Sequence, residues 1–163
     1  MSDPFIGPTS QTYVSQRLRL HYADWGNRDA PPLILLHGGR DHCRNWDWVA
    51  EDLRRDYHII CPDLRGHGTS GWVPWGYTIR EYVEDIGAFL RAISGPTVLM
   101  GHSLGGIIAV ATAKAYPDLV RALIVGDAPL DAVSWGQSIG DQRARMATWR
   151  ALSGGTHPVE EIE

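Results

Sequence analysis

The sequence predicts an α/β protein in which a mostly parallel sheet carries helices on both faces. Two observations support this prediction. Residues 33–36 form a short, wholly apolar run, which is typical of a strand buried on both of its faces. Such runs alternate along the chain with stretches of ten or more residues whose apolar side chains recur at helical spacing. Right-handed crossovers connect strands and helices in this pattern, and they place the strands parallel.

The elements before residue 62 are expected in the following order. Residues 1–10 are interpreted as a frayed lead-in, and from Gln16 apolar and polar residues alternate as in a half-buried strand near a sheet edge. The apolar strand described above comes next. A helix with Trp46 and Leu53 at helical spacing follows, and a second buried strand is expected over residues 57–61.

The second half of the expected sheet begins with a strong helix signal. Thr78 and Glu81 have the spacing of a capping box, and an apolar stripe follows them. A strand is expected over residues 96–100, followed by a tight turn and a helix that runs to Tyr116. Residues 122–125 complete the pattern as a further strand.

The pattern of alternating strands and helices ends at Pro129. Residues 141–152 have the pattern of a polar helix, and residues 154–161 contain a stop signal and the start of another helix. We therefore expect a core over residues 1–130 and a separate segment over residues 131–163. A helix that starts and is not completed indicates the N-terminal part of a longer chain, of roughly 260–290 residues.

Composition narrows the class of protein. The chain has 163 residues, of which 44% are hydrophobic and 21% charged, and these are ordinary values for a globular protein. The formal net charge of −4 argues against nucleic acid or an anionic membrane as the partner. The N-terminus lacks the features of a signal peptide, so a cytoplasmic location is expected. Cys43 and Cys61 show neither C-x-x-C spacing nor a metal-ligand cluster, and no metal or organic cofactor is expected.

The chemistry of the chain is expected at Gly101-His102-Ser103-Leu104-Gly105. This turn matches G-x-S-x-G, the nucleophile elbow, and lies between an expected strand and an expected helix, as the motif requires. A serine hydroxyl becomes a useful nucleophile when a sharp turn exposes it beside a base. The helix that follows offers backbone N–H groups and a positive dipole end to a developing oxyanion.

Three motifs together resemble the α/β-hydrolase superfamily, in the family's order and over about residues 16 to 130. The resemblance is closest to serine-nucleophile members that carry a helical cap, of the esterase and lactonase kind. The motifs are the oxyanion loop His37-Gly38-Gly39, the D-x-R-G-x-G-x-S loop at residues 63–70, and the elbow at residues 101–105. The resemblance implies the α/β-hydrolase fold, here cut after the sixth strand, with residues 131–163 as the start of the cap.

The resemblance also implies roles for individual residues. Ser103 would be the nucleophile, and the backbone N–H groups of Gly39 and Leu104 would form the oxyanion hole. Asp63, Arg65 and His67 are interpreted as residues that hold their loop together and take no part in the chemistry.

The rest of the catalytic triad is less clear from the sequence. In this fold the acid and the histidine follow the serine, and most members place the acid after a seventh strand that is absent here. Asp127 is a candidate acid, with a turn or helix-capping role as the alternative. His157 follows the elbow but lies in the expected cap, so the general base is expected in sequence missing from this chain. His102 is expected to point away from the nucleophile and to pack.

The expected function is hydrolysis of a carboxylic ester, thioester or lactone through an acyl-enzyme on Ser103. Superfamily members that open epoxides or dehalogenate carry an aspartate at the elbow, and the serine here argues against both reactions. A carbon–carbon bond hydrolase or a lyase on the same scaffold, or a non-catalytic binding or receptor-like member, are the alternatives. The expected partner is a small-molecule substrate, and the sequence does not determine the oligomeric state.

Overall fold

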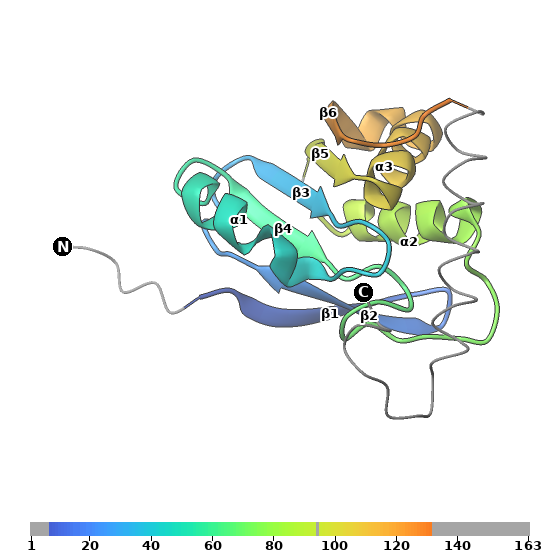
Figure 1. The fold of residues 1–163 in the computed structure, drawn as a ribbon. Coiled ribbons are helices and arrows are strands. Elements are labelled where there is room, and N and C mark those ends of the chain that lie inside the picture. The colour runs from blue at the N-terminus through green and yellow to red at the C-terminus, as the bar shows by residue number, and fades with distance from the viewer. Residues whose placement is uncertain (1–6, 94, 132–163) are drawn as a thin grey trace, which may run out of the picture. The chain divides into compact units, whose positions relative to one another are not determined.

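The computed structural model describes residues 7–93 and 95–131. The chain divides into two compact units between Ala128 and Pro129, and the fold below is that of the first unit. Within the described residues, six strands form one sheet in the order β1-β2-β4-β3-β5-β6 (Figure 1). The strands are β1 (Thr9–Ser15), β2 (Leu18–Asp24), β3 (Pro32–Leu36), β4 (His58–Pro62), β5 (Thr97–His102) and β6 (Val120–Gly126). The helices are α1 (Asp47–Leu53), α2 (Ile79–Arg91) and α3 (Leu104–Ala115), with 3-10 turns η1 (Cys43–Trp46) and η2 (Pro117–Leu119).

The sheet is mostly parallel, as the sequence predicts. Strands β4, β3, β5 and β6 run parallel to one another, whereas β2 pairs antiparallel with both β1 and β4. Residues 132–163, which make up nearly all of the predicted cap, lie outside the described residues. The cap and the expected boundary at residue 130 are therefore not tested. That division of the chain stays a prediction.

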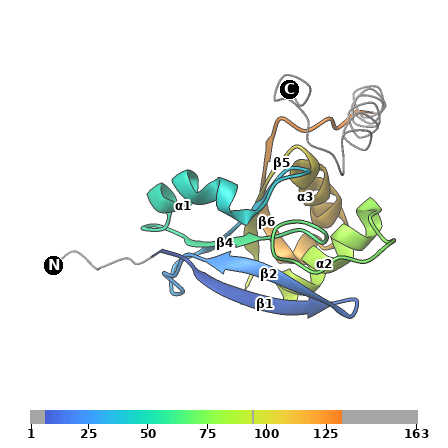
Figure 2. The same ribbon diagram turned by 60° about the horizontal axis from the view of Figure 1, so that its bottom comes forward.

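The expectation of a frayed N-terminus is wrong for Thr9 and Ser10. These residues begin β1, the edge strand, which forms a long antiparallel pair with β2 (Figure 2). Gln16 and Arg17, expected at the start of a strand, form the turn between the two strands with φ of 46° and 66°. Strand β1 is rich in Ser, Thr and Gln, so it lacks the apolar alternation from which a strand is recognised.

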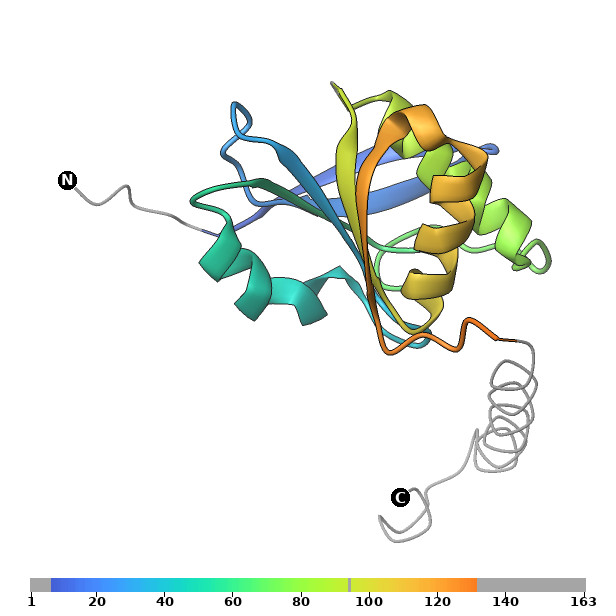
Figure 3. The same cartoon turned by 90° about the horizontal axis from the view of Figure 1, so that it is seen from above.

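The two faces of the sheet carry separate hydrophobic clusters. Helices α2 and α3 lie on one side of the sheet and α1 on the other (Figure 3). Strand β3 serves both, since Ile34 and Leu36 pack toward α2 and α3 while Leu33 and Leu35 pack toward α1. This alternation explains why β3 is wholly apolar and confirms that helices cover both faces.

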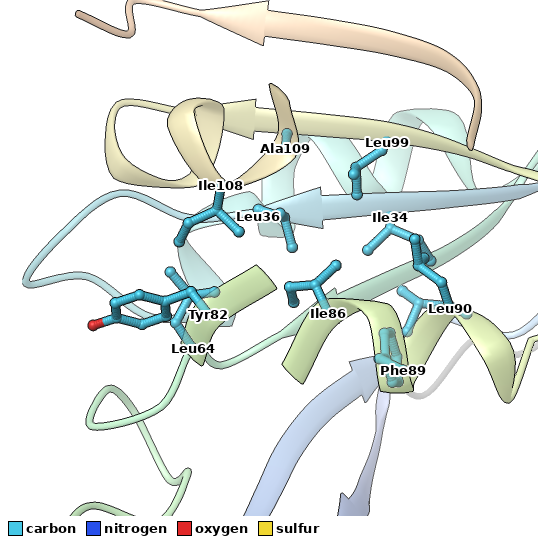
Figure 4. Packing of buried hydrophobic residues seen from close by; sticks show 11 residues of the cluster. Ile34, Leu36, Leu64, Tyr82, Ile86, Phe89, Leu90, Leu99, Ile108 and Ala109 are labelled. Atoms are coloured by element: carbon cyan, nitrogen blue, oxygen red, sulfur yellow. The ribbon is translucent and has the colours of Figure 1, made fainter. Parts of the chain in front are cut away.

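The larger cluster is built around α2, as Figure 4 shows. Its buried side chains come from three strands, two helices and Leu64 in the loop after β4. The helix begins with the predicted capping box, in which the Glu81 side chain accepts a hydrogen bond from the Thr78 backbone N–H at 3.0 Å. The cap fixes where α2 starts and hence which of its residues face the sheet.

The order of the strands determines where a site can form. The chain passes from β3 to β4 on one side of β3, and β5 then adds on the other side. The connection after β3 leads to α1 on one face of the sheet, whereas the turn after β5 leads to α3 on the other. The carboxyl ends of β3 and β5 therefore flank a topological switch point, where open α/β sheets bind their ligands.

Close backbone contacts at this point require two glycines. A Cβ atom on Gly105 would overlap with the carbonyl oxygens of Leu36 and His37, and one on Gly101 would overlap with the backbone of Gly105. Both are the glycines of the G-x-S-x-G motif. They allow α3 to start directly against the end of β3, which brings the turn of β5 beside the loop that follows β3.

We predict that Gly105→Ala lowers the free energy of unfolding by about 2 kcal/mol or more, because the added methyl meets rigid backbone. Gly126→Ala is the matched control. A Cβ atom added at Gly126 would meet only the Gly101 carbonyl oxygen, at 3.9 Å. The free energy of unfolding is therefore expected to change by no more than about 0.5 kcal/mol. Urea unfolding of both variants checks this, and equal effects would contradict the close-approach argument.

Candidate active site

Ser103 lies at the turn between β5 and α3, in a backbone conformation that residues with a side chain rarely adopt. Its φ is 51° and its ψ is −118°. The Ser103 N–H donates to the Gly126 carbonyl at 3.1 Å, and its carbonyl accepts from the Ile107 N–H at 3.2 Å. Serine at the N-cap of a helix usually accepts a hydrogen bond from that helix, but the Ser103 side chain makes no such bond. The Ser103 hydroxyl is therefore not used to cap the helix that it precedes.

The loop after β3 lies directly against this turn. A Cβ atom on Gly38 would lie 3.4 Å from the Cβ of Ser103 and 3.1 Å from Nδ1 of His102. A Cβ atom on Gly39 would lie 3.7 Å from Cδ2 of Leu104. The structure thus brings together the residues that the sequence places in the nucleophile and oxyanion positions.

The two expected oxyanion donors, the backbone N–H groups of Leu104 and Gly39, belong to different kinds of backbone structure. Leu104 is the first residue of α3, and the first N–H groups of a helix have no acceptor within it. Gly39 belongs to no helix or strand, and among the hydrogen bonds of the described residues none uses its N–H. Their use as an oxyanion hole stays a prediction.

His37 anchors the glycine loop, a role that the sequence motif alone does not reveal. Its ring is buried, with Nδ1 donating to the Gly38 carbonyl at 2.7 Å and Nε2 accepting from the Leu64 N–H at 3.0 Å. This pair of bonds requires the neutral ring with its proton on Nδ1. Burial lowers the pKa of His37 to about 4, so the ring stays neutral under ordinary conditions.

Asp63 holds the neighbouring loop in the structural role predicted for it. Its carboxylate accepts from the Cys43 N–H at 2.7 Å, the Thr69 N–H at 2.9 Å and Nδ1 of His21 at 2.8 Å. Burial on its own would raise the pKa of this carboxyl, but the hydrogen bonds outweigh burial and hold the pKa below its usual value.

Arg65 and His67 also serve the loop. The Arg65 guanidinium donates to both carboxylate oxygens of Asp85, at 2.6 Å and 2.9 Å, and to the Gly76 carbonyl at 2.6 Å. Nδ1 of His67 lies 2.9 Å from the Arg65 carbonyl oxygen. The buried Arg65–Asp85 pair ties the loop to α2, so the expected role of these residues in holding the loop is confirmed.

Asp127 lies next to the elbow, at the end of β6. It follows the last residue of β6, Gly126, whose carbonyl accepts from Ser103. Its side chain is exposed and its φ is 43°. Within the part of the chain that the structure describes, no hydrogen bond joins it to a histidine. Its assignment as the acid stays a prediction.

The general base is not found beside Ser103 among residues 7–93 and 95–131. His102 is adjacent in sequence; it is exposed and not buried as a packing residue would be, although its ring lies against Gly38. Other described histidine rings have partners elsewhere, as the bonds of His21, His37, His58 and His67 show. His157 lies outside the described residues.

Two cavities lie apart from the elbow. One of about 450 Å³ is lined by Tyr13, Tyr22 and Phe89 among others, near the amino ends of the parallel strands. The other, of about 380 Å³, is lined by His21, Cys43 and Asp63 among others. Ser103 lines neither cavity, so neither is assigned to its chemistry.

No helix in the described part of the chain is both long and apolar enough to cross a membrane.

The second cavity contains a cluster that sequence reasoning missed. Nδ1 of His21, Sγ of Cys43 and a carboxylate oxygen of Asp63 all lie within 4.8 Å of one another, and the three residues could together hold a metal ion. The expectation that Cys43 belongs to no such cluster is therefore wrong. The three positions have no regular spacing, because β2, η1 and the loop after β4 bring them together only in the fold.

Comparison with known proteins agrees with this geometry. Residues 31–151 match the α/β hydrolase fold family. The chain belongs to this family. It is 39% identical over 110 residues to Lipase LipV of Mycobacterium tuberculosis (strain ATCC 25618 / H37Rv), covering 66% of the chain and 41% of that protein. It is 32% identical over 134 residues to human Epoxide hydrolase 4, covering 79% of the chain and 37% of that protein.

A solved structure shows the same fold over a longer stretch. The crystal structure of a putative lipase from Acinetobacter baumannii AYE superposes with a TM-score of 0.78 at 25% identity, covering 96% of this chain and 58% of that one. The chain of this α/β hydrolase thus spans about two fifths of the two curated relatives and 58% of the solved structure, in each case less than two thirds.

We predict that the Ser103→Gly variant has a free energy of unfolding about 1 kcal/mol higher than that of the Ser103→Ala variant, measured by urea unfolding. Glycine adopts a φ of 51° and a ψ of −118° without the strain that any Cβ incurs there. Both variants lack the hydroxyl, so the comparison isolates the backbone. Equal stabilities, or a more stable alanine variant, would show that the turn is not strained.

We predict that the stability of the fold decreases between pH 6.5 and pH 4 because of His37. Its pKa is depressed from 6.5 to about 4, so the unfolded chain takes up a proton first as the pH falls. The loss approaches about 3 kcal/mol at the acid end of this window. His37→Gln keeps an acceptor near the Leu64 N–H and does not titrate, so its unfolding free energy should change less over the same window. Parallel pH profiles for parent and variant would contradict this prediction.

Proposed function

We propose that the protein is a serine hydrolase that cleaves a carboxylic ester, thioester or lactone through an acyl-enzyme on Ser103. The observation that carries this proposal is the strained backbone of Ser103, at an N-cap where its hydroxyl does not cap the helix. A purely structural serine at this position would be expected to cap α3. A conformation that costs of order 1–3 kcal/mol is maintained where the position of the side chain serves a function.

The proposed reaction uses Ser103 and two backbone N–H groups from the elbow and from the glycine loop that lies against it. The Oγ of Ser103 attacks the acyl carbon, and the backbone N–H groups of Gly39 and Leu104 stabilise the oxyanion that forms, each worth about 3 kcal/mol of barrier. The tetrahedral intermediate expels the alcohol or thiol and leaves the acyl group on Ser103. Water then attacks the acyl-enzyme and releases the acid.

The proton of Ser103 needs a base, and in this proposal a histidine from outside the described residues accepts it. The same histidine then protonates the leaving group and activates the water. Asp127 is the candidate acid for orienting that histidine.

The identity of the nucleophile separates this proposal from the epoxide hydrolase among the relatives. Family members that open epoxides use an aspartate at the elbow, where this chain has Ser103. A lipase among the relatives is consistent with acyl transfer to serine. The substrate is proposed to be a small molecule.

A fluorophosphonate probe tests the proposal on the protein at its natural length, with intact mass as the readout. One covalent adduct is expected, because such probes report an activated serine. Ser103→Ala should form no adduct and should lose activity on simple aryl esters by about 10³-fold or more.

Two results would contradict the proposal. An adduct that persists in Ser103→Ala would place the reactive group elsewhere. A folded parent protein without an adduct would favour a non-catalytic member of the family.

A further inference from the structure

The cluster of His21, Cys43 and Asp63 lies on elements distant from one another in sequence. His21 belongs to β2, Cys43 begins η1, and Asp63 directly follows β4. Nδ1 of His21 lies 2.8 Å from Oδ2 of Asp63 and 3.9 Å from Sγ of Cys43. These three side chains offer one nitrogen, one sulfur and one oxygen donor around a common point.

The backbone fixes the three positions relative to one another. The Asp63 N–H donates to the His21 carbonyl at 2.9 Å, which continues the antiparallel pairing of β2 with β4. The Cys43 N–H donates to Oδ1 of Asp63 at 2.7 Å. Both bonds use groups other than the three donor atoms, so the frame can remain while those atoms change partners.

Two further observations point to a ligand here. The cavity of about 380 Å³ is lined by all three residues, and it gives access and room for a bound ion with a water molecule. In addition, Oγ of Ser10 lies 2.8 Å from Nε2 of His21. Histidine ligands of metals usually have such a partner on the second ring nitrogen, which sets the orientation of the ring.

We propose that these residues form a zinc site, with Nδ1 of His21, Sγ of Cys43 and Oδ2 of Asp63 as ligands. The fourth position of the tetrahedron faces the cavity and takes a water molecule or a small anion. Mixed nitrogen, sulfur and oxygen donors suit Zn²⁺, whereas Mg²⁺ and Ca²⁺ prefer oxygen alone. The site is separate from Ser103 and does not depend on the proposed hydrolase activity.

Two of the three donor separations require only small movements, and the third, between Sγ of Cys43 and the Asp63 carboxylate, lies within 4.8 Å. Donor pairs around tetrahedral zinc lie roughly 3.3–3.6 Å apart, given bonds of about 2.0–2.3 Å. The two separations of 2.8 Å and 3.9 Å each differ from this range by about half an ångström or less. Side-chain rotation on a fixed backbone accommodates shifts of that size.

The protons balance in the following way. Without metal, Nδ1 of His21 carries a proton shared with Asp63, and the Cys43 thiol is neutral. On binding, the thiol releases its proton to solvent, and the imidazole proton moves to Nε2. The Ser10 hydroxyl then rotates from donor to acceptor, so its bond with His21 is kept in both forms.

Cobalt binding tests the proposal, because Co²⁺ occupies zinc sites and a cysteine thiolate gives it a charge-transfer band in the ultraviolet. Titration of the purified, tag-free protein should give one tight Co²⁺ with this band, together with visible bands of tetrahedral cobalt. Added Zn²⁺ should displace the cobalt and bleach both.

Variants locate the site. Cys43→Ser should abolish the charge-transfer band, whereas Cys61→Ser, which changes the other buried cysteine, should keep it. Ser10→Ala should weaken zinc binding about 10-fold through the second ring nitrogen of His21. If Cys43→Ser fails to fold by circular dichroism, His21→Asn serves instead, and it should lose tight binding.

The proposal is overturned by any of three results. They are the absence of a thiolate band in the folded parent protein, a band that survives in Cys43→Ser, or a band that is lost in Cys61→Ser instead. Each result is read from metal binding alone, so it is independent of whether the fluorophosphonate probe labels Ser103.

Discussion

The buried carboxylate of Asp63 holds together the carboxyl end of the sheet. It connects the segment before α1, the loop after β4 and strand β2 through bonds to Cys43, Thr69 and His21. A buried charge is costly unless every lone pair is used, and these donors use both oxygens of Asp63. The arrangement fixes the segments that surround the elbow before any substrate contact is considered.

The position of the candidate active site follows from the strand order combined with this frame. At the switch point between β3 and β5, the connections that follow these two strands leave toward opposite faces of the sheet. The glycines of the elbow then let α3 begin against the end of β3. The nucleophile and the glycine loop thus meet because of topology and close packing, without a direct side-chain bond between them.

Local sequence signals predicted much of this arrangement. The apolar residues of β3, the capping box of α2 and the G-x-S-x-G turn each depend on neighbours within a few positions, and all three appear as expected. Strand β1 was missed because its polar residues conceal the alternation, and its stability comes from pairing with β2. Such pairing is a tertiary property that propensity does not report.

The site features that were missed have the same origin. The anchoring of Gly38 by His37 depends on Leu64, which lies 27 residues further along the chain. The meeting of His21, Cys43 and Asp63 depends on the register of β2 with β4. Neither pattern has a spacing that a sequence can display. The strain at Ser103 is also invisible in the sequence, since serine itself does not favour a positive φ.

The segment between His37 and Cys43 connects the two proposed sites and is anchored at both ends. Its first end is fixed by His37, whose buried ring bonds the Gly38 carbonyl and the Leu64 N–H, and its last end by the Cys43 N–H on Asp63. Gly39 lies between these two anchors. An oxyanion donor is effective only if its direction is set before the charge develops, because reorientation would consume the stabilisation it provides. The two buried polar anchors hold the short segment that contains Gly39, so the direction of its N–H is set before the charge develops. They do so whether or not the thiol of Cys43 binds a metal ion.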